Sequence, residues 1–264
     1  MQVYLKTLAN AMLSSTSDVY GDYLLNYPEI MSGRRVRIEV AQGRRVHFEF
    51  YSSAGGEAEG EPGTSVPIPL LGGVLGLRKA IVHRDNVEAF ARLNSAKSLQ
   101  SLVVGQGAQW PDNTIYKNAG IALVGAKEYD NLLPMLMRKR FDFLPLSIIE
   151  IDGVLEKQTT VFDALVVEDN TFIYYPIPTY IRVSDTQPEL LGRLNLGLKR
   201  IQASGEFRAI MQKYIEPYVK GISAQQAKLF VLENPMLTEQ ENRSRSRRIT
   251  ETYFADTQKI FWLY

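Results

Sequence analysis

Residues 102–113 read Leu-Val-Val-Gly-Gln-Gly-Ala-Gln-Trp-Pro-Asp-Asn and join an apolar run to the start of a helix. The apolar residues 102–104 are typical of a buried strand, and Pro111 favours a helix that begins close to Asp112. Free backbone N–H groups at such a helix start favour an anion or a carbonyl oxygen. The glycine spacing and the lack of a lysine exclude a Walker or dinucleotide-binding loop. We therefore treat residues 105–112 of this segment as the first candidate for ligand contact.

Short apolar runs and helical patterns alternate on both sides of this segment. Alternation of this kind predicts the α/β class, with parallel sheets built from right-handed crossovers. The predicted strands cover residues 23–31, 46–50, 77–83, 121–124 and 141–146, and the predicted helices cover residues 3–13, 34–42, 87–99, 129–140, 188–198 and 206–214.

Composition narrows the classes of function. The chain has 264 residues, 45% of them hydrophobic, so a sizeable core in one large or two modest units is expected. A net charge of +1 gives no general attraction to nucleic acid or to an anionic membrane. The lack of cysteine excludes disulfides and thiolate sites. No apolar run reaches the ~18 residues of a membrane span, so no direct membrane insertion is expected.

Several ordered motifs resemble those of the type II periplasmic solute-binding proteins, the bacterial extracellular family 3-like transporter substrate-binding domains. The motifs are Pro-Ile-Pro-Leu-Leu-Gly-Gly-Val-Leu-Gly-Leu-Arg at 67–78, Gln-Trp-Pro-Asp at 109–112, Arg-Phe-Asp at 140–142 with Glu150, Tyr-Pro-Ile-Pro-Thr-Tyr at 175–180 and Glu-Asn-Pro-Met-Leu at 233–237. The chain looks like a divergent member of that family.

The resemblance implies two α/β lobes, each a mostly parallel sheet flanked by helices, that close by a hinge on a ligand in a cleft. Lobe one would comprise residues 1–83 plus 181–264, including C-terminal helices, and lobe two residues 84–180. The chain begins at a helix, so the first strand of lobe one is expected to be missing. The absent secretion signal then points to a truncated chain whose expected location is the periplasm.

Two departures from the amino-acid-binding members bear on the ligand. The arginine that clamps the ligand carboxylate in those members has no counterpart in residues 53–65, and their amine-binding aspartate corresponds to Ser147. An ordinary α-amino acid is therefore not the expected ligand. A small polar or aromatic organic molecule is expected instead.

The predicted ligand-binding residues each have a structural alternative. Asp112 could cap the following helix, Trp110 could pack in a core, and Gln109 could lie in an ordinary glycine loop. Ser147 and Glu150 could contact the ligand or form a Ser-x-x-Glu capping box.

Three further residues complete the predicted site. Tyr51 and Ser52 could line the opposite wall or form a solvated strand end. Arg78 could reach a carboxylate or pair with an internal acid such as Asp85.

Other residues argue against catalysis and metals. His47 and His83 lie far apart without a metal-ligand pattern, so no zinc site is expected. The basic cluster Arg243, Arg245, Arg247 and Arg248 is interpreted as a solvated helix face. No catalytic residue and no cofactor are predicted.

The sequence thus predicts a monomeric, extracytoplasmic solute-binding protein that serves transport or sensing, with a permease or sensor as partner. The alternatives are a degenerate, non-binding interaction module and, less favoured, a lyase or dehydratase on the same fold.

Overall fold

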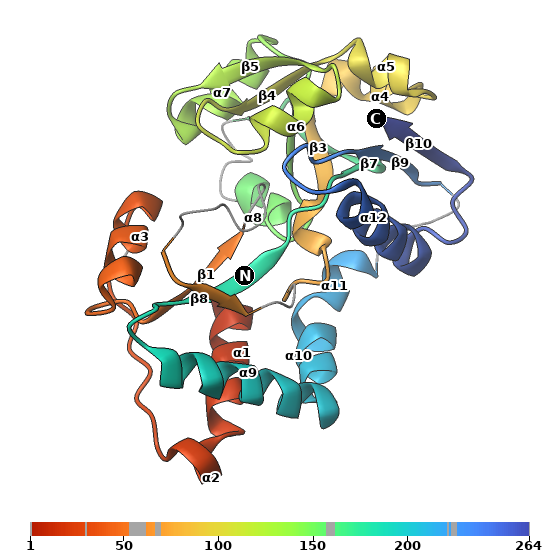
Figure 1. Cartoon of the computed structure of the whole chain (residues 1–264). Coiled ribbons are helices and arrows are strands. Elements are labelled where there is room, and N and C mark those ends of the chain that lie inside the picture. Colours follow the sequence, from red (N-terminus) through yellow and green to blue (C-terminus); the bar gives the residue numbers. More distant parts are fainter. Residues whose placement is uncertain are drawn as a thin grey trace. The chain divides into compact units, whose positions relative to one another are not determined.

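The structure is a computed structural model that describes residues 2–29, 31–52, 62–66, 70–156, 162–220, 222 and 226–263. The chain forms two compact units. Unit 1 contains the described residues up to Leu71 together with residues 179–217. Unit 2 contains residues 72–178 and the described residues of 218–264. Figure 1 shows the course of the chain through the elements of both units.

Unit 1 is built on a three-stranded antiparallel sheet. β8 (Thr179–Val183) is its central strand, between β1 (Phe48–Ser52) and β2 (Thr64–Val66). β8 is antiparallel to both neighbours. The prediction of a mostly parallel sheet in each lobe is therefore wrong for unit 1. Strand direction here depends on a partner that lies more than a hundred residues away in the chain, which the local alternation of elements does not reveal.

Helices complete unit 1, and the main contact lies between α1 (Gln2–Ser14) and α9 (Pro188–Ala203). The buried face of α1 carries Tyr4, Leu8 and Met12. Gly197 of α9 allows a close approach, since a Cβ there would lie 2.2 Å from the Met12 carbonyl oxygen. The remaining helices are α2 (Ser17–Tyr20), α3 (Gly33–Gln42), α10 (Glu206–Tyr214) and α11 (Glu216–Val219), which spans the boundary between the units.

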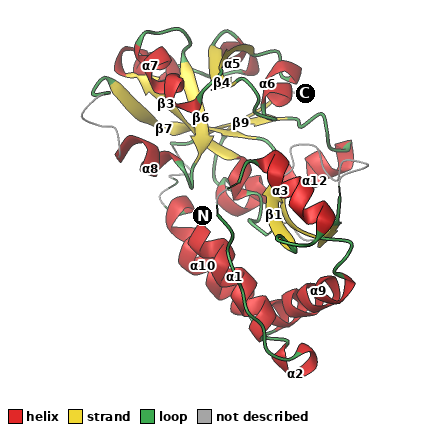
Figure 2. Cartoon of the chain, turned by 90° about the vertical axis from the view of Figure 1, so that its left-hand side faces the viewer, coloured by secondary structure: helices red, strands yellow, loops and turns green. Residues whose placement is uncertain are grey.

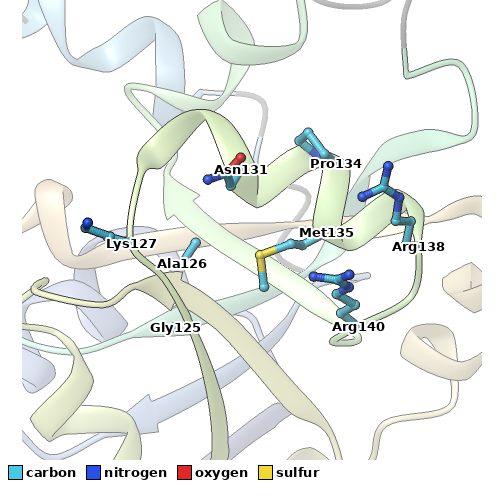
Figure 3. Close-up of a pocket in the computed structure, with 8 residues that line it drawn as sticks. All are labelled: Gly125, Ala126, Lys127, Asn131, Pro134, Met135, Arg138 and Arg140. Carbon is cyan, nitrogen blue, oxygen red and sulfur yellow. The ribbon is translucent and has the colours of Figure 1, made fainter.

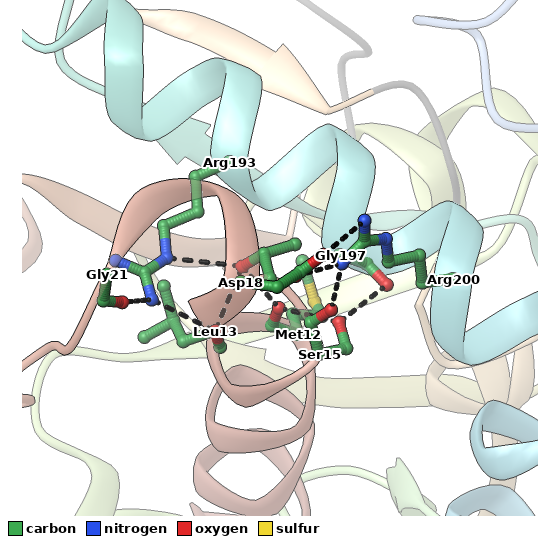
Figure 4. Close-up of polar contacts among 9 residues, drawn as sticks. Met12, Leu13, Ser15, Asp18, Gly21, Arg193, Gly197 and Arg200 are labelled. Carbon is green, nitrogen blue, oxygen red and sulfur yellow. Dashed lines mark hydrogen bonds and ion pairs between the residues drawn. The ribbon is translucent and has the colours of Figure 1, made fainter.

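Two arginines of α9 bind the end of α1 and the turn after it (Figure 4). Arg193 donates through Nη2 to the carbonyl oxygens of Leu13 at 3.0 Å and Gly21 at 2.8 Å, and through Nε to the Thr16 hydroxyl at 3.2 Å. Arg200 donates to the Ser15 carbonyl oxygen at 2.5 Å and pairs with Asp18. Carbonyl oxygens at the end of α1 and in the turn after it thereby accept hydrogen bonds from charged donors. We call this set of contacts the α1–α9 junction.

Unit 2 contains a seven-stranded sheet in the order β10-β9-β7-β3-β6-β4-β5. β3 (Leu77–His83) is antiparallel to β6 (Phe143–Ser147) and β7 (Leu165–Tyr174), and every other neighbouring pair is parallel. The other strands are β4 (Val103–Gly107), β5 (Ala122–Ala126), β9 (Lys228–Leu232) and β10 (Lys259–Leu263). This mostly parallel sheet agrees with the predicted α/β class.

Short helices accompany the sheet, and Figure 2 shows α5, α6 and α7 beside it. One face is covered by an apolar core that includes Leu144 and Leu146 of β6 with Leu133 and Leu136 of α7. The helices are η1 (Val74–Gly76), η2 (Arg84–Asn86), α4 (Val87–Ala91), α5 (Ala96–Gln100), α6 (Asn113–Asn118), η3 (Tyr129–Asn131), α7 (Leu132–Met137), α8 (Ile151–Glu156) and α12 (Glu239–Tyr253).

The units have boundaries that differ from the predicted lobes. β3 was assigned to lobe one, but it pairs with β6 and β7 and so belongs to unit 2. Residues 218–264 were also assigned to lobe one, yet they add β9 and β10 to the unit 2 sheet. This segment is not purely helical, because its two apolar runs bury themselves as parallel strands.

Two smaller predictions fail for local reasons. Residues 21–29 form no strand and are mostly exposed, so no apolar face is available to pair them with a sheet. The predicted helix 87–99 is interrupted after Ala91, and Ser95 starts α5 through a capping box with Ser98. Serine at this position competes for backbone N–H groups and restarts the helix. No helix in the described residues is long and apolar enough to cross a membrane.

Candidate functional site

Three polar residues of the unit 2 sheet share one face. Arg78 of β3 lies opposite Ser147 of β6, and Val104 of β4 lies opposite Phe143 of β6. Since side chains alternate along a strand, Gln106, two residues beyond Val104, points to the same face as Ser147 and Arg78. The apolar core around Leu144 and Leu146 therefore covers the other face.

Arg78 is buried, with 7% of its surface exposed, and it is held by an acid and an aromatic ring. Its Nη2 donates to Asp112 Oδ2 at 2.9 Å, and its guanidinium carbon lies 5.2 Å from the centre of the Tyr175 ring. Burial alone would lower the pKa of Arg78, but the nearby Tyr175 and Asp112 raise the pKa above its ordinary value. The guanidinium therefore stays charged.

Two buried tyrosines complete the contacts of Asp112. Tyr175 donates through Oη to Asp112 Oδ2 at 2.7 Å, and Tyr116 donates to Tyr175 Oη at 3.3 Å. Burial raises the pKa of both phenols above the ordinary value, so both remain protonated donors. Asp112 makes no side-chain capping bond to α6, so the capping alternative for this residue is wrong. We call Arg78, Asp112, Tyr116 and Tyr175 the Arg78 cluster.

Gln106 and Ser147 carry buried polar atoms without partners. Both residues are 0% exposed, and neither the Gln106 amide nor the Ser147 hydroxyl has a hydrogen-bond partner among the described residues. The Ser147 side chain therefore forms no capping box with Glu150, which meets it only through the backbone, by its N–H to the Ser147 carbonyl at 2.9 Å. An unsatisfied buried polar group costs about 1–3 kcal/mol. Such groups need an explanation outside the protein's own contacts, in the form of a ligand or a bound water.

A more accessible set of residues lies at the loops that follow β4 and β6. Trp110 is half-buried, and its ring centre lies 6.1 Å from that of Tyr129, which is 46% exposed. Gln109 is exposed. The Glu150 side chain is 46% exposed, and its Oε2 lies 3.9 Å from Arg78 Nη1. We call Gln109, Trp110, Tyr129 and Glu150 the aromatic rim.

The Trp110 side chain takes the packing role that was its structural alternative. It packs against the apolar core of unit 2, and a Cβ at Gly107 would lie 2.5 Å from the indole nitrogen. Gly107 thus leaves room for the indole. The predicted helix 129–140 begins at Tyr129, but the structure places this residue on the short η3 turn, where its side chain stays partly exposed. Burial raises the pKa of the Tyr129 phenol, and the nearby Glu150 raises it further.

The remaining two predicted site residues, Tyr51 and Ser52, belong to unit 1. Tyr51 Oη shares a hydrogen bond of 2.7 Å with Ser65 Oγ, and the Arg182 guanidinium lies 4.0 Å from the Tyr51 ring centre. Ser52 Oγ lies 3.0 Å from Thr179 Oγ1. Both side chains are therefore engaged by neighbouring strands. The six other predicted site residues lie in unit 2.

Sequence reasoning did not identify Tyr116, Tyr129 or Tyr175 as site residues. Gln106 lies in the candidate segment 105–112 but was not singled out, although an amide in the middle of an apolar strand is unusual. Tyr175 lies inside the motif at 175–180, which supported the resemblance without assigning this tyrosine to the site.

The structure bears on the other predictions as well. No group of three or more potential metal ligands occurs within the described part of the chain. Arg243, Arg245 and Arg247 of the predicted basic face pair with Glu239, Glu241 and Glu251, four residues away along α12. That pairing supports the interpretation of a solvated helix face.

Comparison with known proteins gives a result at the level of fold. No protein-family model matches the chain. No curated protein matches it either. An ancestral arginine-binding protein bound to arginine is similar in structure, with a TM-score of 0.53, 15% identity and coverage of 80% of this chain and 87% of that one. The chain has the fold of these binding proteins.

Two further solved structures agree. The substrate-binding protein of an amino acid ABC transporter has a TM-score of 0.51 at 13% identity, covering 81% of this chain and 87% of its own. An ancestral amino-acid-binding protein, described as a precursor of cyclohexadienyl dehydratase, has a TM-score of 0.50 at 14% identity, covering 80% and 84%. At identities this low, the structural similarity establishes only the type II solute-binding fold. The function therefore has to be argued from the site.

Proposed function

We propose that the protein is a solute-binding protein that captures a small organic molecule, for transport or sensing, without transforming it. The observation that carries this proposal is the unsatisfied pair Gln106 and Ser147, buried on the same sheet face as Arg78. Polar groups of this kind are stabilised when a ligand supplies their missing hydrogen bonds. The solved neighbours, which include an amino-acid-transporter binding protein, support the same class of function.

In this proposal the residues of unit 2 have distinct roles. Gln109, Trp110 and Glu150 contact the ligand directly, because they are accessible and Trp110 and Tyr129 offer flat apolar faces. Ser147 and Gln106 give it hydrogen bonds. Arg78 is positioned by Asp112, whose carboxylate already neutralises the guanidinium, so this part of the site favours a neutral or amine-bearing group over a free carboxylate. Tyr51 and Ser52 of unit 1 stay predicted contacts.

The proposal extends to setting and partners. A binding protein of this kind acts outside the cytoplasm as a monomer, and a membrane permease or a sensor receives its ligand. Binding without turnover is proposed because the Arg78 cluster keeps its tyrosines protonated and its acid engaged, which leaves no poised base there. Assays for release of new products from the bound ligand would test this absence of turnover.

Thermal unfolding against a library of amino acids, polyamines, sugars and aromatic acids tests the proposal. A ligand of the native state raises the unfolding midpoint in a saturable manner. Ser147→Ala is expected to reduce that rise, whereas Ser204→Ala, which removes a partly buried hydroxyl at the end of α9, leaves it unchanged. If no compound shifts the midpoint of well-folded protein, the proposal fails and a non-binding interaction module replaces it.

A further inference from the structure

A polar pocket lies in unit 2, between the end of β5 and the C-terminal turn of α7 (Figure 3). Its volume is about 390 Å³. None of the residues that line it belongs to the Arg78 cluster or to the aromatic rim. Its lining includes Lys127, Asn131, Pro134, Met135, Arg138 and Arg140.

The pocket has three cations and no anion in its lining. Lys127, Arg138 and Arg140 form no ion pair among the residues that the structure describes. The acids nearest in sequence do not line the pocket either, and Asp142 instead accepts a hydrogen bond of 2.7 Å from the Val103 N–H. Three uncompensated charges at one hollow create a local positive potential, although the whole chain carries a net charge of only +1.

The end of α7 places the two arginines on one side of the pocket. Lys139 adopts a left-handed conformation with φ of 53°, its N–H donates to the Leu136 carbonyl at 2.8 Å, and the Arg140 N–H donates to the Met135 carbonyl at 3.1 Å. These bonds form a Schellman ending, in which glycine is the usual left-handed residue. Lys139 turns away to pair with Asp85 at 2.7 Å. Arg138 and Arg140, on either side of it, both line the pocket.

We propose that this pocket binds a phosphate-bearing small molecule. Two guanidinium groups supply planar forks that match phosphate oxygens, and Lys127 and the Asn131 amide add donors from the opposite side. A single carboxylate has too few oxygens to use all of these donors. Met135 and Pro134 offer apolar surface for the organic part of a phosphate ester. The partial negative charge at the end of the six-residue helix α7 offsets only part of the positive charge.

Isothermal titration at low ionic strength with pyrophosphate, inorganic phosphate and acetate tests the proposal. Pyrophosphate is expected to bind in a saturable manner and more tightly than phosphate, and acetate is expected not to bind. The double variant Arg138→Gln with Arg140→Gln should weaken pyrophosphate binding at least about tenfold, because both forks are lost. Arg92→Gln combined with Arg243→Gln removes the same charge from exposed arginines on α12 and beside α4, and should change nothing.

Several outcomes would overturn the proposal. An equal loss of pyrophosphate affinity in the control variant would show attraction by net charge alone. An unchanged pyrophosphate affinity in the arginine double variant would show that the anion binds elsewhere. Binding of oligoglutamate but not pyrophosphate would mark the hollow as a contact for an acidic protein segment. Thermal unfolding of each variant without ligand shows that the fold is intact, and Lys127→Gln, which alters the opposite wall, provides an independent second variant.

Discussion

Two buried polar regions of this protein differ in how completely their buried polar groups are hydrogen-bonded. At the α1–α9 junction of unit 1, Nε and Nη2 of Arg193 both donate to carbonyl or hydroxyl oxygens (Figure 4). On the unit 2 sheet, Arg78 Nη2 and Tyr175 both donate to Asp112, but Arg78 Nε, the Gln106 amide and the Ser147 hydroxyl are buried without a hydrogen-bond partner. Complete satisfaction is typical of structural polar contacts, whereas unsatisfied buried groups are typical of sites that await a ligand. The comparison therefore assigns a structural role to the α1–α9 junction and a ligand-binding role to the polar face of the unit 2 sheet.

The largest expected effect is at Asp112. Replacing it with alanine leaves the buried Arg78 charge without its principal partner, so Asp112→Ala should lower the free energy of unfolding by about 3–5 kcal/mol. Denaturant unfolding measures this loss. The double variant Arg78→Met with Asp112→Leu removes both charges and should be more stable than Asp112→Ala. If the free energy of unfolding of the double variant fell by the sum of the losses in the two single variants, the two side chains would act independently.

At the α1–α9 junction the expected loss is smaller. Arg193→Met keeps apolar contacts but leaves the Gly21 carbonyl oxygen without its donor, so the free energy of unfolding should fall by about 2 kcal/mol. Ligand-induced shifts of the unfolding midpoint should be unaffected, because this junction is structural. Lys199→Met, on an exposed position of the same helix, is the matched control. If Arg193→Met changed ligand binding but not stability, the division between the two regions would be wrong.

The sequence predicted the class of fold and several elements well for a definite reason. Apolar periodicity is local, and β3, β4 and β6 were all recognised because each carries a short buried run. The comparisons agree with the predicted type II binding fold. Strand partners are not local. The sequence therefore could not show that β8 lies between β1 and β2, or that β9 and β10 extend the sheet of unit 2.

Arg78 and Ser147 were predicted through the resemblance, whereas topology alone predicts only the loop residues of the site. Trp110, Asp112 and Glu150 follow strands, and parallel strands bring their carboxyl ends to one edge, so their proximity followed from topology. The Arg78 cluster depends on β3 running antiparallel between β6 and β7, which places Arg78 opposite Ser147. That register is set by pairing across the sheet. No spacing within the chain encodes it.

Alkaline pH should affect the Arg78 cluster through its tyrosines. Burial raises the pKa of Tyr116 and Tyr175 above the ordinary value of 10.0, so the unfolded chain loses these protons first as the pH rises. The contribution of each tyrosine to stability is therefore fully present below pH 10. Above pH 10, the free energy of unfolding falls by about 1.4 kcal/mol per pH unit for each such tyrosine, until the pH reaches its folded-state pKa. Tyr175→Phe should flatten this decline in denaturant unfolding measured across alkaline pH. An equally steep decline in the variant would mean that Tyr175 ionises normally in the folded protein.

The sharpest test of the comparison has the smallest effect on stability. Gln106→Met keeps the length of the side chain and removes a buried amide that has no partner, so the ligand-free protein should gain about 1 kcal/mol. Thr16→Val at the α1–α9 junction is the matched control, since its buried hydroxyl is bonded to Leu13 and Arg193, and it should instead lose about 1 kcal/mol. Denaturant unfolding compares the two. Changes of opposite sign in the free energy of unfolding, with ligand binding weakened only by Gln106→Met, would show that Gln106 lowers the stability of unit 2 and is needed for the ligand. A loss in both variants would mean that bound water already satisfies Gln106 and that its role is structural.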